Sequence, residues 1–304
     1  MKEEYESIEE LNEALQKRME EENTKPREEF DNLSSIDMYN ILYRLFELES
    51  PIQYANKVTI NELNKIPFYK LFREYLKSIN NKGELKLTAK GNLPRNLCKE
   101  LYGLGIIKEH IFESGISKLN KESDSVVLQN LKIIGDLSGI TKKRNNKLSL
   151  TKNGKKLYEL GQEFELFKKI FETNVLKFNI AYHDGYDDRF QIQAVIGYTL
   201  YLLLRYGDKE REIEFYVNKN LKAFPQLLDE FSGSWGTPEK QYRSCYEIRV
   251  FKRFLNYYGF TETDEEGIIG SFEKKVKVKA KGVFREILKI EKSHFRFRKF
   301  KHDA

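Results

Sequence analysis

The loop at residues 183–188, His-Asp-Gly-Tyr-Asp-Asp, holds the side chains best suited to chemistry. Its three carboxylates, on Asp184, Asp187 and Asp188, and the imidazole of His183 could together bind a hard divalent cation. A metallohydrolase would need further histidine ligands, and the other histidines, at positions 110, 294 and 302, lie in unrelated contexts. The acids also lack the alternating spacing of a calcium loop. The sequence therefore favours a hydrogen-bonded turn packed by its tyrosines, with a metal-dependent enzyme as the third-ranked function.

Other catalytic signatures do not stand out in the sequence. The segment Asn153-Gly-Lys-Lys lacks the earlier glycine and the Ser/Thr of a phosphate-binding loop. The two cysteines, Cys98 and Cys245, have no metal-ligand spacing. With no apolar signal segment after Met1, they suggest buried thiols in a reducing cytoplasm. We therefore expect a cytoplasmic protein that is not an enzyme and needs no metal or cofactor.

Basic side chains give the stronger functional signal, because Lys and Arg contact phosphates and base edges. Residues 1–31 contain twelve acids and five bases, so the rest of the chain carries a net charge of +13 within an overall +6. A basic body is compatible with a nucleic-acid partner. The candidate nucleic-acid-binding residues are Lys142, Lys143 and Arg144 in one segment; Arg249, Lys252, Arg253 and Asn256 in a second; Lys275, Lys277 and Lys279 in a third; and Arg296 and Arg298 in the tail.

A short phrase that occurs three times positions these residues. Residues 85–93, 148–157 and 276–284 each read as a strand with period-two apolar residues, a polar turn ending in Gly, and a helix start. Glycine would allow a positive φ in that turn. Upstream of the second and third copies, residues 131–137 and 251–257 carry apolar residues on one helical face, followed by Gly139 and Gly259.

The order helix, glycine cap, strand, turn, strand resembles the winged helix-turn-helix fold. The resemblance implies that the helix before the hairpin enters the major groove while the wing contacts the backbone. Arg249, Arg253 and Asn256 would then contact bases, and the wing lysines would contact phosphates. The first copy departs from the pattern, because Asn80-Asn81-Lys82-Gly83 leads straight into its strand, so its hairpin could be missing.

Apolar periodicity predicts the remaining elements. Helices are expected at residues 5–22, at 34–46 behind an N-cap at Ser34 with an acid at Asp37, at 164–177, at 192–206, and at 212–228 with a break at Pro225. The predicted fold is α+β, mainly α, with two or three winged-helix-like units around a helical central region. The predicted boundaries are 1–50 for the acidic N-terminal helices, 51–163 for two winged-helix-like units, 164–239 for the helical centre and 240–304 for a third unit with a basic aromatic tail.

Three further phrases resemble a family of uncharacterised bacterial proteins, the plasmid open-reading-frame-3-like proteins. They are Gly91-Asn92-Leu93-Pro94 after Leu87-Thr88, the central Tyr-x-Asp-Gly-Tyr-like segment, and Leu-Lys-Ala-Phe ending in Pro225. That family has no settled activity, so the resemblance implies no catalytic residues.

The sequence as a whole predicts a bacterial, cytoplasmic regulatory protein that binds nucleic acid, DNA rather than RNA, through winged-helix-like units. The alternative is a protein-interaction adaptor or inhibitor that uses the same wings on a protein partner. No apolar stretch approaches the length of a membrane span, so no membrane partner is expected.

Overall fold

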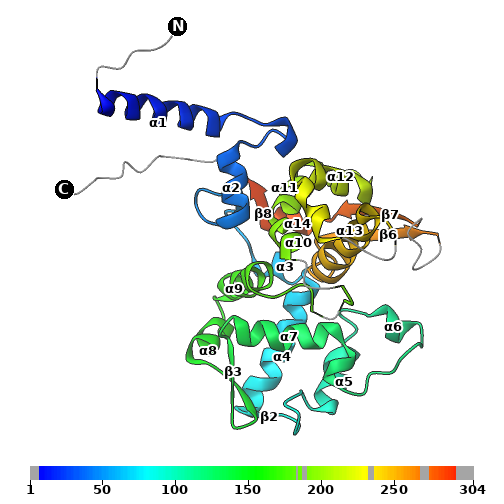
Figure 1. Ribbon diagram of the computed structural model, residues 1–304. Helices are drawn as coiled ribbons and strands as arrows, with labels where there is room; N and C mark the ends of the chain where they lie inside the picture. The colour runs from blue at the N-terminus through cyan, green and yellow to red at the C-terminus, as the bar shows by residue number, and fades with distance from the viewer. Residues whose placement is uncertain (1–6, 183, 187–189, 232–235, 268–273, 292–304) are drawn as a thin grey trace.

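The computed structural model describes residues 7–182, 184–186, 190–231, 236–267 and 274–291. Its elements form two lobes, one above the other in Figure 1, and helix α9 (Glu163–Leu176) lies between them. Helices predominate, and the described strands form small antiparallel sheets. The prediction of an α+β, mainly α protein is therefore confirmed.

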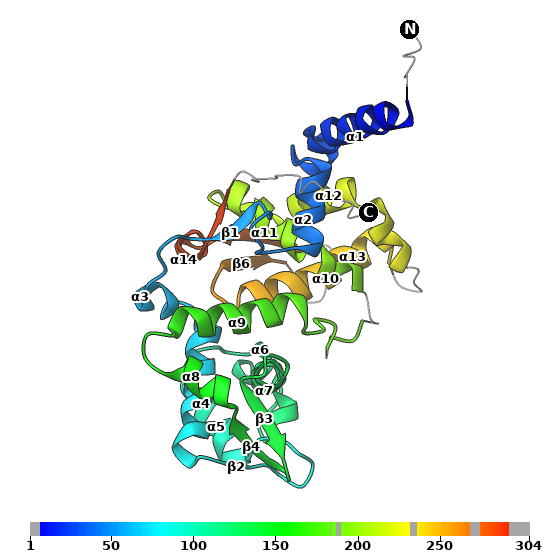
Figure 2. The same ribbon diagram turned by 90° about the vertical axis from the view of Figure 1, so that its left-hand side faces the viewer.

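The N-terminal segment leads from a projecting helix into the upper lobe (Figures 1 and 2). Its elements are α1 (Ile8–Thr24), the 3₁₀ turn η1 (Glu28–Phe30), α2 (Ser35–Tyr43), β1 (Ile52–Tyr54) and α3 (Ile60–Leu63). The Ser34 hydroxyl accepts the Asp37 N–H at 3.1 Å, and the Asp37 carboxylate accepts the Ser34 N–H at 3.2 Å. This reciprocal pair is a capping box, so the predicted N-cap is confirmed. Helix α2 ends at Tyr43, short of the predicted Phe46, which adopts a φ of +70°.

The lower lobe is built around helix α4, in which Phe68, Phe72, Tyr75 and Ile79 recur every three or four residues and are buried. Pro67 occupies the first turn of this helix, where its missing N–H costs nothing. The elements of the lobe are α4 (Pro67–Lys82), β2 (Leu85–Lys86), α5 (Arg95–Gly103), α6 (His110–Glu113), η2 (Glu122–Asp124), α7 (Val126–Leu137), β3 (Thr141–Arg144), β4 (Lys147–Leu150) and α8 (Lys152–Tyr158).

The sheet of the lower lobe has the order β2-β4-β3, and both strand pairs are antiparallel. Strand β2 belongs to the first repeated phrase and pairs with β4 of the second, with Leu85 opposite Leu148. The two phrases assigned above to separate units therefore share one sheet. Residues 51–163 contain one hairpin, β3–β4, because the partner of β2 lies some 60 residues away in the chain and not in an adjacent strand.

The upper lobe repeats this wiring. Its elements are α10 (Phe190–Ala194), α11 (Ile196–Tyr206), β5 (Arg211–Glu212), α12 (Ile213–Ala223), η3 (Pro225–Glu230), α13 (Pro238–Tyr246), its π-helical continuation η4 (Glu247–Leu255), β6 (Thr261–Glu266), β7 (Lys275–Ala280), α14 (Gly282–Ile287) and β8 (Leu288–Ile290). The sheet order is β5-β7-β6. In both lobes the chain runs helix, edge strand, a further set of helices and hairpin, and the edge strand pairs with the second strand of the hairpin. The third repeat thus belongs to the same unit as α11 and α12, whereas the sequence analysis assigned these two helices to a separate helical region at residues 164–239.

The glycines of the repeated phrase serve different purposes. Gly91 has a φ of +78°, as the sequence predicts. Gly154 lies inside helix α8, where a Cβ would sit 2.0 Å from the Ile140 carbonyl oxygen. That glycine is needed for close packing of the helix on the strand, not for a turn. Gly282 begins helix α14, and a Cβ there would meet nothing within 4 Å.

Helix α9 joins the two lobes through an aromatic cluster. The ring of Phe171 lies 5.8 Å from Phe254 and 5.0 Å from Tyr258, measured between ring centroids. Phe68 of the lower lobe stacks on Tyr258 at 5.1 Å. These rings are at most 2% exposed, so the core runs without a break from one lobe to the other.

The two ends of the body are tied together by a short strand pair. Strand β1 pairs antiparallel with β8, with Ile52 opposite Ile290 and Tyr54 opposite Leu288. Within the described residues, no helix is long and apolar enough to cross a membrane.

Candidate nucleic-acid interface

The β3–β4 hairpin of the lower lobe carries three of the predicted binding residues. Its two-residue turn, Asn145-Asn146, has φ values of +49° and +55°. Positive φ at both central residues is the type I′ geometry that matches the twist of paired strands, and Asn tolerates it better than most residues. The turn places Arg144 directly opposite Lys147.

The tip of the hairpin is held against the chain that follows β2. The Asn146 side-chain amide donates to the carbonyl oxygens of Leu87 at 3.2 Å and Thr88 at 2.8 Å. The Leu87 N–H donates back to the Asn146 carbonyl at 2.9 Å. The cations beside this turn therefore project from a rigid support.

Three cations lie in one row across the lower sheet. Strand register places Lys86 opposite Lys147, and Lys147 opposite Arg144. Like charges directly opposite each other destabilise a sheet. One acid, Glu84, lies close enough to pair with Lys147, at 2.7 Å, and this hydrogen bond lowers the pKa of Glu84. Both partners are more than half exposed, so the pair contributes little.

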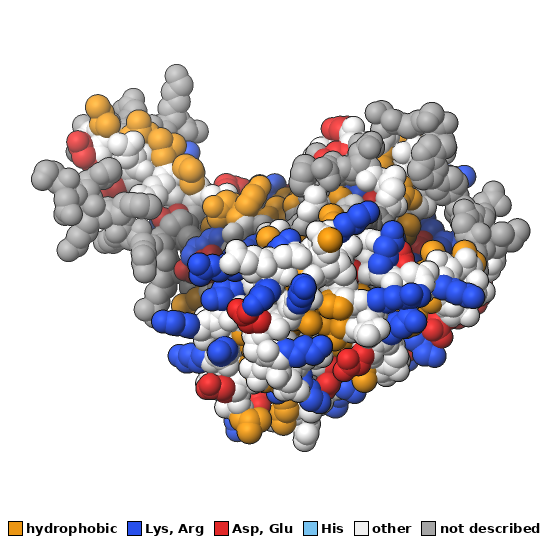
Figure 3. Space-filling view, turned by 90° about the horizontal axis from the view of Figure 1, so that it is seen from below, with side chains coloured by type: hydrophobic (Ala, Val, Ile, Leu, Met, Phe, Trp, Pro, Cys, Tyr) orange, Lys and Arg blue, Asp and Glu red, His pale blue; other side chains and the backbone are white. Residues whose placement is uncertain are grey.

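The hairpin and helix α8 form a surface that contains cations only. Residues 140–158 include seven Lys or Arg and no Asp or Glu. All seven are exposed: Lys142, Lys143, Arg144, Lys147, Lys152, Lys155 and Lys156. We call this set the basic surface. Figure 3 shows many Lys and Arg side chains spread over the face of the molecule seen from below, with Asp and Glu side chains interspersed among them.

The β6–β7 hairpin of the upper lobe differs, although its sequence predicted the same role. Strand register places Lys275 opposite Glu266, Lys277 opposite Asp264 and Lys279 opposite Glu262. Lys277 also forms an ion pair with Glu266 at 2.8 Å. The lysines do share one strand face, as predicted, but acids of the neighbouring strand neutralise their field.

The predicted base-reading helix of the upper lobe uses its polar side chains internally. Arg249 is 1% exposed. Lys252 pairs with Glu247 at 2.8 Å and also with Glu265. Burial opposes the charge of Lys252, but the hydrogen bonds to these two acids raise its pKa. The Asn256 side chain bonds the hydroxyls of Thr261 and Thr263 at the start of β6.

The other predicted residues do not join these into one site. Arg253 is half-buried and lines a narrow internal space of about 10 Å³ beside Asn130 and Asn174. Arg296 and Arg298 lie outside the described residues. A base-contacting set made of Arg249, Arg253 and Asn256 is thus not presented on the surface, because each side chain faces the protein interior or a neighbouring strand.

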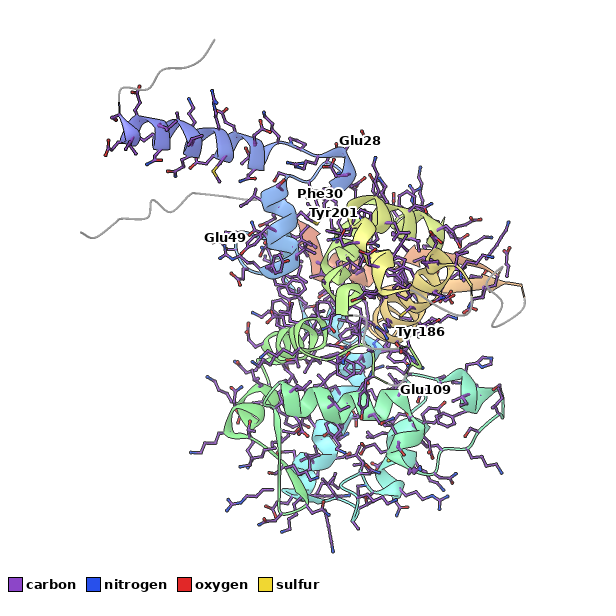
Figure 4. The ribbon with its side chains drawn as sticks, viewed as in Figure 1. Glu28, Phe30, Glu49, Glu109, Tyr186 and Tyr201 are labelled. Carbon is purple, nitrogen blue, oxygen red and sulfur yellow. The ribbon has the colours of Figure 1, made fainter. Side chains whose placement is uncertain are left out.

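The acidic loop is organised around a buried ion pair. Both side chains of the Asp184–Arg249 pair are fully buried. The second Asp184 oxygen accepts from Arg249 at 3.1 Å and from the Tyr186 N–H at 2.9 Å. Figure 4 labels Tyr186 in the region where the upper lobe meets the lower lobe, above Glu109. His183, Asp187 and Asp188 lie outside the described residues. Among the residues that are described, no group of three His, Cys, Asp or Glu could hold a metal ion.

The helix before the lower hairpin is equally enclosed. Most of α7 is buried, from Val127 to Gly135. Its lysine, Lys132, bonds the Gly91 carbonyl at 2.8 Å and the buried Glu122 at 2.9 Å. The one cation of α7 is therefore largely buried and used inside the protein.

Sequence reasoning missed part of the basic surface. Lys86, which lies beside the basic surface, was also missed, because its pairing with Lys147 depends on a strand partner far away in the chain. Lys152, Lys155 and Lys156 were read as part of the repeated phrase. The signal that could have found them is the absence of acids from residues 140–158.

Comparisons of the chain with models of protein families, with curated proteins and with solved structures find no match.

Proposed function

We propose that this protein is a non-enzymatic, cytoplasmic regulator that binds nucleic acid, duplex DNA above all, through the basic surface of its lower lobe. Both lobes are interpreted as winged-helix units, because each combines an edge strand, intervening helices and a hairpin in the same strand order. The lower hairpin is the wing that meets the phosphates.

The observation that carries this proposal is the seven exposed cations of residues 140–158 with no acid among them. The strands on both sides of Lys147 place a cation opposite it, and the repulsion between these like charges destabilises the free protein. A polyanion removes that repulsion and releases its own counterions on binding. The upper hairpin, in which every lysine faces an acid, offers no such gain.

Recognition is expected to be independent of sequence. The helices that would enter the major groove, α7 and α13 with η4, are largely buried. Base edges are then out of reach, and binding depends on the backbone alone. This revises the expectation that the upper helix reads bases. Two duplexes of unrelated sequence should bind alike; a preference beyond about a thousandfold would indicate base reading.

The test measures the affinity for a DNA duplex by fluorescence anisotropy at a series of salt concentrations. Replacing Lys142, Arg144 and Lys155 together by Ala should weaken binding and flatten the salt slope by about one unit per lost phosphate contact. None of the three has an ion pair among the described residues, so the fold should tolerate the change.

The matched control removes the same number of positive charges from the upper hairpin, by replacing Lys275, Lys277 and Lys279 with Ala. It should leave affinity and slope nearly unchanged, because those lysines face acids. Equal losses in the two triple variants would contradict the assignment of the basic surface. No complex at micromolar protein in low salt would contradict nucleic-acid binding and favour an acidic protein partner for the same surface.

A further inference from the structure

Helix α1 displays an apolar stripe that stays exposed among the residues that the structure describes. The side chains of Ile8, Leu11, Leu15 and Met19 are 73%, 36%, 45% and 64% exposed. The helix has 17 residues, none of them buried. It runs away from the body in Figures 1 and 2, and Figure 3 shows hydrophobic side chains open to solvent along it. An isolated helix of this length is marginal in water, so α1 needs a packing partner.

The upper lobe has a groove of about 310 Å³ with a mixed lining, which includes the polar side chains of Asn179 and Gln193. Ile41 and Leu42 of α2 and the following Leu45 form one apolar wall, and Val175 and Leu176 of the C-terminal turn of α9 form another. Leu176 is 51% exposed at the rim. The adjacent Lys177 also lines the groove and has no ion pair among the described residues.

We propose that α1 of one copy docks into this groove on a second copy, so that two chains exchange their N-terminal helices. The stripe is apolar and meets the Leu42 and Leu176 side chains of the groove, so docking removes apolar surface of both from water. The charges also match, because α1 carries six Glu against Lys17 and Arg18, while the groove rim offers Lys177. Exchange of identical elements is a common route to dimers.

The chain between α1 and α2 directs the helix outward, toward another molecule. Asp31, at 4% exposure, is fixed to the upper lobe by ion pairs with Arg205 and Lys219. The Asp31 carbonyl also accepts from Arg205 at 2.8 Å. Docking on a second copy leaves this anchor intact.

The first measurement is the mass of the full chain in solution by sedimentation equilibrium. We expect a dimer. Leu15→Lys puts a charge in the stripe and Leu176→Glu puts one at the groove rim, and each should reduce the mass to that of one chain. Both sites are exposed, so both variants should fold. The control is Leu160→Glu, which makes the same change at a leucine that is 89% exposed elsewhere, and it should remain dimeric.

Mixing two variants distinguishes a dimer formed by helix exchange from a dimer formed by pairing of two α1 helices. Equal amounts of the Leu15→Lys and Leu176→Glu variants should form a dimer, since one intact helix meets one intact groove. Met19→Cys mixed with Leu176→Cys should form a disulfide between chains; the natural Cys98 and Cys245 are both buried. A full chain that stays monomeric up to high concentration overturns the proposal. So does a Leu176→Glu variant that stays dimeric, because α1 would then pair with another α1.

Discussion

The side chains of Arg249 and Asp184 are both fully buried, and this determines what their ion pair contributes. Removing two charges from water costs several kcal/mol per ion, so such a pair is weak support for stability as it stands. Breaking it is different, because the surviving charge stays buried without its partner. The pair also holds the Tyr186 loop, whose carbonyl accepts from Arg249 at 3.4 Å.

Replacing Asp184 by Asn should therefore lower the free energy of unfolding by about 3–5 kcal/mol. The matched control is Glu286→Gln, which breaks the exposed pair with Lys65 and should cost no more than about 1 kcal/mol. Denaturant titration measures both. If Asp184→Asn lowers the free energy of unfolding by no more than the control does, Arg249 must find another counterion.

Helical spacing alone placed Arg249 and Lys252 on one helix, with Asn256 now found at its C-cap, but it could not tell a binding cation from a buried one. The partner of Arg249 lies 65 residues away, and Lys252 is neutralised by Glu265 of the following strand. Partner identity depends on tertiary packing, so the function of each side chain was beyond the local pattern.

At the scale of elements, helix α7 is capped from outside its own sequence. The carboxylate of Glu109 accepts hydrogen bonds from the Ser125 hydroxyl and, at 2.9 Å, from the Val126 N–H. Burial raises the pKa of Glu109 above its ordinary value of 4.5, and these hydrogen bonds only partly oppose the rise. The folded state therefore holds a proton that the unfolded chain releases at lower pH.

A raised carboxyl pKa gives a stability contribution that is present below pH 4.5 and is lost as pH rises through the folded value. Glu109→Gln cannot lose a proton, so its free energy of unfolding relative to the natural protein should increase from pH 4.5 to pH 7. Denaturant titrations at the two pH values measure this change. A difference between the two proteins that does not vary with pH would contradict it.

Long periodic elements were predictable, whereas the strands that define each sheet were not. The helix at residues 164–177 and the break at Pro225 appear within a residue or two of their predicted places. Strands β2 and β5 have two residues each, too few to show a period, and their partners are distant in the chain. This explains why the sequence analysis assigned to separate units segments that share one sheet in the structure.

At the scale of the whole molecule, Phe171 stands where the lobes meet. Its ring contacts Phe46 of the N-terminal segment at 5.6 Å and Phe260 of the upper lobe at 5.5 Å, measured between centroids. Aromatic pairs of this kind contribute beyond their buried area. We therefore expect the lobes to unfold together.

Phe171→Ala should cost about 3–5 kcal/mol and raise amide hydrogen exchange in both lobes. Hydrogen exchange read by mass spectrometry follows each lobe separately. The control is Leu160→Ala, at a position that is 89% exposed, and it should change neither the free energy of unfolding nor the hydrogen exchange of either lobe. Faster exchange confined to one lobe would show that the lobes open independently.

The β1–β8 pair also gives the molecule a mechanical property. Glu291 N–H donates to the Pro51 carbonyl at 2.9 Å, so the chain enters and leaves the body at the same edge of the strand pair. A force that pulls on both ends would load the hydrogen bonds of these antiparallel strands one at a time. Tension from the N-terminal side reaches the Asp31 anchor and α2 of the upper lobe first, and once these detach the pair would open like a zipper at low force.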